Sequence, residues 1–207
     1  MKVILVNGSP NENGCTHRAL SEIEDTLHEC GIETEIFYIG TEAIPGCLGC
    51  RGCRDLGACV IDDKVNEFVR LAADADGFIF GSPVYYASAN GALVAFMDRA
   101  FYSDKCGHNN NFATKPAAAI VSARRAGTTA SIDQLNKYFA ISAMPIITST
   151  YWNMVHGNTP EEVEQDLEGL RTMRNLARNM AWFLKMKEAA GIEAPKYEYK
   201  PMTNFIR

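Results

Sequence analysis

The sequence lacks the features of a membrane protein and of a nucleic-acid-binding protein. It contains no apolar run that approaches the roughly 20 residues of a membrane span. Its 25 acidic residues outnumber its 20 lysines and arginines, the net charge is -5, and Arg124-Arg125 is the only pair of adjacent basic residues. We therefore expect no membrane insertion and no nucleic-acid partner. The first apolar segment begins at Val3, which leaves no room for a signal peptide and predicts a cytoplasmic location.

Two common phosphate-binding fingerprints are also missing. The chain has neither the G-x-G-x-x-G pattern of dinucleotide-binding folds nor the G-x-x-x-x-G-K-[ST] pattern of P-loop NTPases. Residues 1–16 show a different pattern, in which an apolar run at 3–6 ends at a turn at 7–10 and a helical pattern follows. A helix that starts after such a turn presents free N–H groups to an anion. The segment therefore predicts a phosphate site that needs no lysine.

The 207 residues fit one domain that buries about 70% of its unfolded surface. Seven cysteines are present, and because nothing indicates an oxidising compartment we predict no disulfide framework. Four cysteines lie in one short segment, and the other three are scattered and expected to be core or surface thiols. The clustered residues are Cys47, Cys50, Cys53 and Cys59, and the scattered residues are Cys15, Cys30 and Cys106.

Five apolar segments alternate with five helical patterns. The predicted strands are residues 3–6, 33–39, 77–81, 117–121 and 145–148. We expect a capping box of Ser131 and Gln134 at the fourth helix, one last helix from Pro160 to about Ala190, and an exposed polar loop at 104–114. This alternation implies an α/β fold: a doubly wound, five-stranded parallel sheet between helices on both faces, in three α/β/α layers. We predict the flavodoxin-like strand order 2-1-3-4-5.

The loops with unusual composition all follow a predicted strand. They are residues 9–16, 82–88, 122–129 and 151–157. In an open parallel sheet, ligands bind beyond the carboxyl ends of the strands, at the point where the strand order reverses. The sequence therefore predicts one ligand site along this edge of the sheet.

Two of these loops resemble known flavin-binding loops. Residues 8–16, GSPNENGCT, are similar to the FMN-phosphate loop GSPRxxGNT of the flavodoxin-like NADPH-dependent FMN reductase family, although Asn11 and Glu12 occupy a segment that is often basic there. Residues 82–88, SPVYYAS, resemble the SPVYxxS stretch of the same family, and Asp98-Arg99 matches a pair that is common in its next helix. The resemblance implies bound FMN and NAD(P)H as co-substrate. The implied FMN-binding residues are Ser9, Asn11, Asn13, Gly14, Cys15, Thr16, Pro83, Val84, Tyr85, Tyr86, Ala87, Ser122, Arg124 and Gly127.

No side chain is required for the hydride transfer itself, because the flavin N5 carries that chemistry. Arg124 is a candidate to stabilise negative charge on the reduced flavin. Trp152 and His156 follow the last predicted strand, where they are candidates to close a substrate pocket. The alternative for all three residues is ordinary packing or solvation.

The clustered cysteines form the pattern CxxCxxCxxxxxC. Such spacing is compatible with a [4Fe-4S] cluster, with zinc or with four free thiols, although structural zinc sites more often use two separated CxxC pairs. The stretch resembles the compact cysteine motif of iron-sulfur flavoproteins, including the Asp62-Asp63 pair that follows it. The resemblance implies that Cys47, Cys50, Cys53 and Cys59 hold a cluster that exchanges single electrons with FMN.

These observations predict an FMN-dependent oxidoreductase. Its donor would be a nicotinamide or a ferredoxin-like protein, and its acceptor a quinone, nitro or azo compound. The alternatives are a flavodoxin-type electron carrier and a cysteine-based redox sensor. We expect a flavodoxin-like FMN-binding domain at residues 1–190, with a cysteine loop at 41–62, and a C-terminal tail at 191–207 that packs on a partner subunit. Family likeness and the long last helix favour a homodimer or homotetramer.

Overall fold

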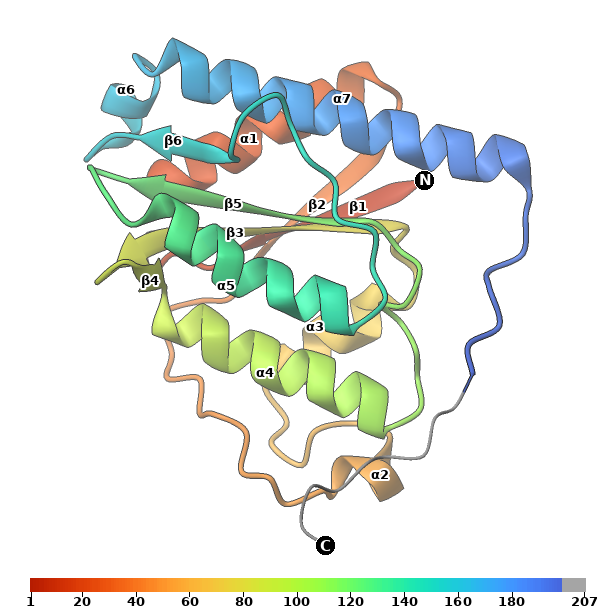
Figure 1. The fold of residues 1–207 in the computed structure, drawn as a ribbon. Helices are drawn as coiled ribbons and strands as arrows, with labels where there is room; N and C mark the ends of the chain where they lie inside the picture. Colours follow the sequence, from red (N-terminus) through yellow and green to blue (C-terminus); the bar gives the residue numbers. More distant parts are fainter. Residues whose placement is uncertain (199–207) are drawn as a thin grey trace, which may run out of the picture.

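A computed structural model describes residues 1–198 of the protein. Its sheet has five parallel strands in the order β2-β1-β3-β5-β6, and a short sixth strand, β4, pairs antiparallel with the end of β3 (Figure 1). The strands are β1 (Lys2–Asn7), β2 (Glu33–Tyr38), β3 (Gly77–Tyr85), β4 (Ser88–Ala89), β5 (Ala117–Ala123) and β6 (Met154–His156). Without β4, this is the predicted order 2-1-3-4-5, which is confirmed.

Helices cover both faces of the sheet, as Figure 1 shows. The helices are α1 (Cys15–Glu29), α2 (Cys53–Leu56), α3 (Lys64–Ala72), α4 (Gly91–Cys106), α5 (Thr128–Ile141), α6 (Pro160–Val163) and α7 (Leu167–Ala190). One hydrophobic core lies between the sheet and α1 with α7, and a second lies between the sheet and α3, α4 and α5. The predicted three-layer arrangement is therefore confirmed.

The continuous apolar run of β1 reflects burial on both faces. Val3 and Leu5 belong to the core under α1 and α7, whereas Ile4 and Val6 belong to the core above α3 and α4. Because successive side chains of a strand point to opposite faces, a strand between two helix layers needs apolar residues at every position. β1 lies between β2 and β3, so its carboxyl end lies next to that of β3.

The prediction for the last strand is wrong. Within residues 145–148, Ile146 makes only an isolated bridge to Ala117, and the strand that joins β5 is β6. Polar contacts join the start of the segment between Ile147 and β6 to α7. Ser149 Oγ donates to the carbonyl of Thr172 at 2.6 Å, and Asn179 Nδ2 donates to the carbonyl of Thr148 at 2.7 Å.

Two helix predictions also need correction. The single last helix is interrupted, because Asp166 caps a new helix, α7, by accepting from the Gly169 N–H at 2.9 Å. The predicted capping box lies inside α5, which begins at Thr128. There, Ser131 Oγ donates to the carbonyl of Gly127, and Gln134 Oε1 accepts from the N–H of Ala89 in β4 at 3.0 Å. A local hydrogen bond at the start of α5 therefore occupies Ser131, and a tertiary contact occupies Gln134.

The polar stretch at 104–114 is only partly an exposed loop. Helix α4 continues to Cys106, and Asp104 is buried, where its carboxylate accepts from the Asn111 N–H. Phe112 belongs to the core and stacks on Phe101 with ring centroids 4.5 Å apart. Phe112 and the hydrogen bond between Asn111 and Asp104 therefore hold this segment against the domain.

Residues 191–198 follow α7 without helix or strand and run down one side of the molecule (Figure 1). Tyr197 lines a cavity of the same chain together with Phe101 and Ile141. Tyr199 and Phe205, which belong to the predicted tail, lie outside the described residues. Among the described helices, none combines the length and the apolar character needed to cross a membrane.

Candidate flavin site and cysteine loop

Three of the predicted loops converge at the carboxyl ends of β1, β3 and β5. The Gly8 N–H donates to the carbonyl of Gly81 at 2.9 Å, which joins the first loop to β3. Thr16 Oγ1 and Ser122 Oγ lie 2.9 Å apart and share a hydrogen bond, which joins α1 to β5. A Cβ on Gly127 would lie 2.7 Å from Cα of Ala87, so the second and third loops are in direct contact.

Side chains within the first loop hold its shape. Asn7, at the end of β1, accepts from the Ser9 N–H at 3.1 Å and donates to the carbonyl of Glu12 at 2.9 Å. Ser9 Oγ accepts from the Asn11 N–H at 3.1 Å. Asn7 was not among the predicted site residues, although a polar residue that ends a fully buried strand is a usable signal. Hydrogen bonds within the protein therefore fix the shape of the loop that precedes α1.

The N-terminus of α1 suits a phosphate group. Its N-cap residue is Gly14, no side chain caps the helix, and its first turn contains no acidic residue. A Cβ on Gly14 would lie 2.9 Å from Cβ of Asn11, so the turn passes close to the helix start. Free backbone N–H groups and the positive end of the helix dipole fit an anion there. The donor set is compatible with the phosphate of FMN.

The two predicted phosphate hydroxyls are both buried. Ser9 and Thr16 are 4% and 1% exposed, and each is already hydrogen-bonded within the protein. Their hydroxyl groups therefore brace the loop, whereas its exposed residues are Pro10, Asn11, Glu12 and Asn13. Cys15 lies beside them, where burial raises the pKa of its thiol, and its Sγ donates to the carbonyl of Gly157 at 3.6 Å.

The second loop is a tight hairpin between β3 and β4. Its central residues, Tyr86 and Ala87, have φ angles of 51° and 58°, which correspond to a type I′ turn. Such angles are unusual for residues other than glycine, asparagine and aspartate, and this kind of strain is concentrated at functional sites. Tyr86 is fully exposed and Tyr85 is about half exposed. The turn therefore presents two aromatic rings at the sheet edge.

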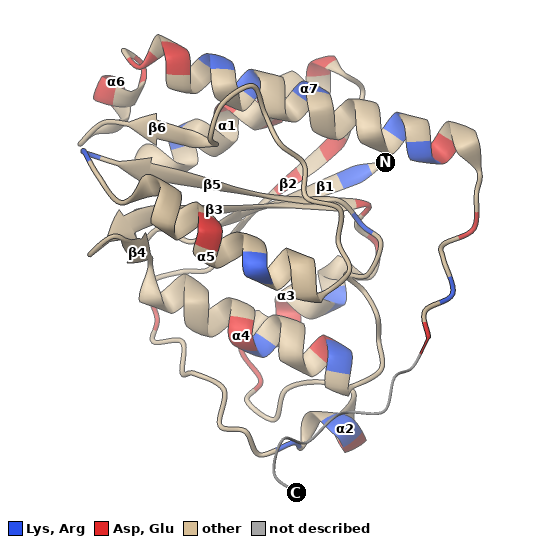
Figure 2. Cartoon of the chain, in the orientation of Figure 1, with Lys and Arg blue, Asp and Glu red and all other residues tan. Residues whose placement is uncertain are grey.

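The third loop carries the basic segment 124–125, which lies among mostly uncharged loops in Figure 2. Arg124 is exposed, and Gly127 adopts a φ of 99°, which favours glycine. His156, at the end of β6, reaches this loop, because its Nε2 lies 3.1 Å from the carbonyl of Arg125. The sheet edge thus brings together the predicted residues of the first three loops and His156.

Trp152 does not follow the carboxyl end of a strand, as the sequence predicted. It precedes β6, packs edge-on against Tyr151 with ring centroids 4.7 Å apart, and lines a cavity of about 310 Å³ beside α5. The expectation that it follows the last strand depended on the wrong strand assignment. His156 is the residue that the carboxyl end of β6 presents.

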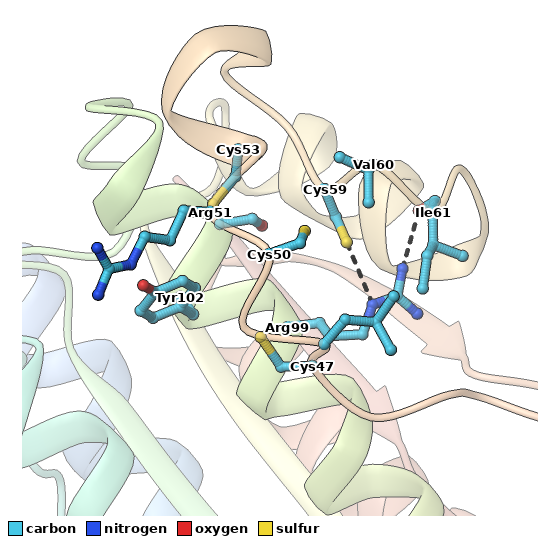
Figure 3. A pocket seen from close by; sticks show the side chains of 11 residues that line it. Cys47, Cys50, Arg51, Cys53, Cys59, Val60, Ile61, Arg99 and Tyr102 are labelled. Carbon is cyan, nitrogen blue, oxygen red and sulfur yellow. Dashed lines mark hydrogen bonds between the residues drawn. The ribbon is translucent and has the colours of Figure 1, made fainter.

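The four clustered cysteines line one cavity, together with Arg99 and Tyr102 of α4 (Figure 3). Cys47 and Cys50 are exposed, Cys59 is partly buried and Cys53 is buried. The cavity encloses about 20 Å³, so the loop must open around any group larger than a water molecule. A Cβ on Gly46 or Gly49 would meet nothing within 4 Å, so no neighbouring atom packs closely against this part of the loop.

The described positions of the sulfurs do not match those of ligands around a single metal ion. Within residues 1–198, no three His, Cys, Asp or Glu side chains meet as they would around one metal ion. Zinc holds its sulfurs at about 2.3 Å and thus within about 4 Å of one another. The four cysteines line one shared cavity, and a set of four cysteine thiols is the donor set that a [4Fe-4S] cluster uses.

Residues outside the motif fix the cysteine loop. Asn66 in α3 accepts from the Cys59 N–H at 3.0 Å and donates to its carbonyl at 2.9 Å. Arg99 donates through Nε to Cys59 Sγ at 3.3 Å. Burial, the neighbouring Cys106 thiol and the nearby Cys50 raise the pKa of Cys53. Asn66 contacts the loop from α3, which directly follows it, and Arg99 and Cys106 contact it from α4, which the spacing of the motif does not reveal.

Several known proteins are similar to this chain in sequence. The sequence profile of a family described as NADPH-dependent FMN reductase matches residues 1–159. An iron-sulfur flavoprotein of Methanocaldococcus jannaschii is 32% identical over 191 residues, which cover 90% of this chain and 98% of the relative. An iron-sulfur flavoprotein of Methanosarcina thermophila is 27% identical over 190 residues, which cover 90% and 96% of the two chains.

Solved structures support the fold. The structure of RosB with bound 8-demethyl-8-formylriboflavin-5'-phosphate matches with a TM-score of 0.73 at 12% identity, over 100% of this chain and 94% of that chain. A flavodoxin from the domain Archaea matches with a TM-score of 0.58 at 16% identity, over 89% and 99% of the two chains. The fold is therefore flavodoxin-like, and by the extent of its sequence match this chain belongs to the NADPH-dependent FMN reductase family.

Proposed function

We propose that this protein is an FMN-dependent oxidoreductase that takes electrons from NAD(P)H and delivers them to a small quinone, nitro or azo acceptor. The observation that carries this proposal is the convergence of the three loops at the carboxyl ends of β1, β3 and β5. Family membership adds independent support, and so does a relative named NADPH azoreductase, from Bacillus sp. strain OY1-2, which is 29% identical over 140 residues.

Each loop has a distinct task in this proposal. The uncapped start of α1, next to Gly14, would hold the phosphate, since its N–H groups lack side-chain acceptors. The turn at Tyr86 and Ala87, braced by Gly127, would form the slot for the flavin ring. The exposed guanidinium of Arg124 would stabilise negative charge on the reduced ring. Bound FMN would accept a hydride at N5 and return two electrons to the acceptor.

We also propose that Cys47, Cys50, Cys53 and Cys59 hold a [4Fe-4S] cluster. The shared cavity, the four-thiol donor set and the relatives named iron-sulfur flavoprotein support this assignment. The cluster would exchange single electrons with its surroundings, which would also admit a ferredoxin-like donor.

A homo-oligomer, either a dimer or a tetramer, remains our proposal for the assembly. It is supported by large apolar side chains that stay exposed on α7, among them Leu167 and Trp182. Sedimentation of the purified protein tests it, and a monomer at micromolar concentration would contradict it.

The test of function starts from protein purified without oxygen. We expect a flavin absorption spectrum, about four iron and four sulfide per chain, and steady NAD(P)H oxidation when a quinone is supplied. Cys50→Ser should lose the iron and keep the FMN, whereas Cys30→Ser, a matched thiol that lies outside the cavity, should keep both. Flavin without iron would remove the cluster. Flavin without turnover on any acceptor would leave an electron carrier, and absence of flavin would favour a cysteine-based sensor.

A further inference from the structure

Arg99 is a buried charge that the flavin chemistry does not explain. It lies on α4, about 12 Å along the helix axis from Gly91, the first residue of the helix, because each residue advances the helix by about 1.5 Å. Its side chain has no exposed surface. Its guanidinium points into the cavity of the cysteine loop (Figure 3). Placing a cation there is costly unless every N–H group finds a partner.

The cysteine loop and Asp63, which directly follows it, supply all of these partners. Nη1 and Nη2 donate to the Asp63 carboxylate at 2.6 and 2.9 Å, which is a bidentate pair. Nη2 also donates to the carbonyl of Ile61 at 2.8 Å, and Nη1 lies 3.5 Å from that of Pro45. One side chain therefore joins both ends of the segment that carries the four cysteines.

The remaining N–H group of Arg99 is directed at a sulfur atom. Nε donates to Cys59 Sγ at 3.3 Å, while Asn66 holds the backbone of Cys59 on both its N–H and its carbonyl group. Asp63 is itself fixed as the N-cap of α3, because it accepts from the Val65 N–H at 3.0 Å. The Nε–Sγ contact is therefore anchored at both of its ends.

We propose that Arg99 is a positioning residue of the cysteine site, which shapes the loop for the cluster and raises the reduction potential of the cluster through its hydrogen bond to Cys59. This inference rests on the proposed function, since it requires Cys59 to be a cluster ligand. Reduction adds one electron and makes the cluster more negative. A cationic donor at a ligand sulfur stabilises that reduced form.

The opposite charges of Arg99 and Asp63 predict opposite shifts of the cluster potential when either one is removed. Arg99→Gln removes the positive charge from the sulfur and should lower the midpoint potential of the cluster. Asp63→Asn removes the negative charge that offsets Arg99 and should raise it. If Arg99 had only a structural role, the two variants would not shift the cluster potential in opposite directions, because either substitution loosens the same loop. Arg171→Gln, an exposed arginine of α7 that pairs with Glu168, is the matched control and should leave the potential unchanged.

The experiment is a dithionite titration of anaerobic holoprotein, followed by electron paramagnetic resonance, with iron measured for each variant. The proposal expects a lower cluster potential in Arg99→Gln, a higher one in Asp63→Asn and an unchanged flavin potential in both. Equal potentials in Arg99→Gln and wild type at equal iron content overturn it, and so do shifts of the same sign in both variants.

Metal-free protein provides a second measurement in case a variant loses its iron. Hydrogen exchange of residues 45–63 should be about tenfold faster or more in Arg99→Gln, while Arg171→Gln matches wild type. Unchanged protection of this segment overturns the proposal. Wild-type protein without iron would refute the cluster assignment instead, and the exchange measurement would then decide the role of Arg99 in shaping the loop.

Discussion

Gly127→Ala tests the contact between the two loops that we assign to the flavin ring. Gly127 has a φ of 99°, and an added Cβ would lie 2.7 Å from Cα of Ala87 and 2.8 Å from Cγ1 of Val84. Left-handed backbone costs a residue with a side chain about 1–2 kcal/mol. Overpacking against a backbone atom that cannot rotate away adds about 1–3 kcal/mol. The expected loss in the free energy of unfolding is therefore about 2–5 kcal/mol.

Gly31→Ala is the matched control for the backbone contribution. Gly31 has a φ of 73°, but an added Cβ would meet nothing within 4 Å. Its expected cost is the conformational part alone, about 1–2 kcal/mol. The difference between the two variants measures the steric contact at the proposed ring slot.

Urea unfolding of FMN-free protein gives both stabilities, and quenching of FMN fluorescence gives the dissociation constant. We expect Gly127→Ala to raise the dissociation constant at least about tenfold, which corresponds to about 1.4 kcal/mol, because the turn at Ala87 must move. Gly31→Ala should bind FMN like wild type. If Gly127→Ala destabilises no more than Gly31→Ala and binds FMN normally, the placement of the ring slot is wrong.

Two further predictions concern stability. Asn90→Ala should cost about 0.5–2 kcal/mol in urea unfolding, because Asn90 caps α4 by accepting from the Ala92 N–H at 2.7 Å; an unchanged midpoint would contradict this role. Burial alone would raise the pKa of Glu22, but hydrogen bonds from Arg174 and Arg18 outweigh it and lower the pKa. The ionised carboxylate therefore stabilises the fold above its ordinary value of 4.5, and this contribution is lost as the pH falls through the lowered pKa. Glu22→Gln should destabilise the protein by about 1–3 kcal/mol at pH 7 and progressively less below pH 4.5, so a constant difference between pH 7 and pH 3 would contradict the assignment.

Local sequence patterns predicted the layers and the strand order. The uninterrupted apolar run at 3–6 requires cover on both faces, and strands that alternate with helices impose a parallel sheet. The carboxyl ends of such strands meet at one edge, so the convergence of the first three loops followed from the alternation. The four-cysteine spacing likewise indicated one site, because its short gaps keep the sulfurs in one loop.

Only tertiary structure decided which segment completes the sheet and what surrounds the sulfurs. The segments around Ile146 and Val155 are both apolar, but the first makes only an isolated bridge to Ala117 at the start of β5, whereas the second pairs with residues 121–123 at its end. Arg99 contacts Cys59 from α4, which lies 40 residues further along the chain. A local sequence pattern can indicate that a residue is buried, but it does not indicate which distant atom that residue contacts. The sequence by itself therefore determined the fold class and the two candidate sites. The partners of Gln134, Asp63 and Arg99 depended on packing between segments far apart in the chain.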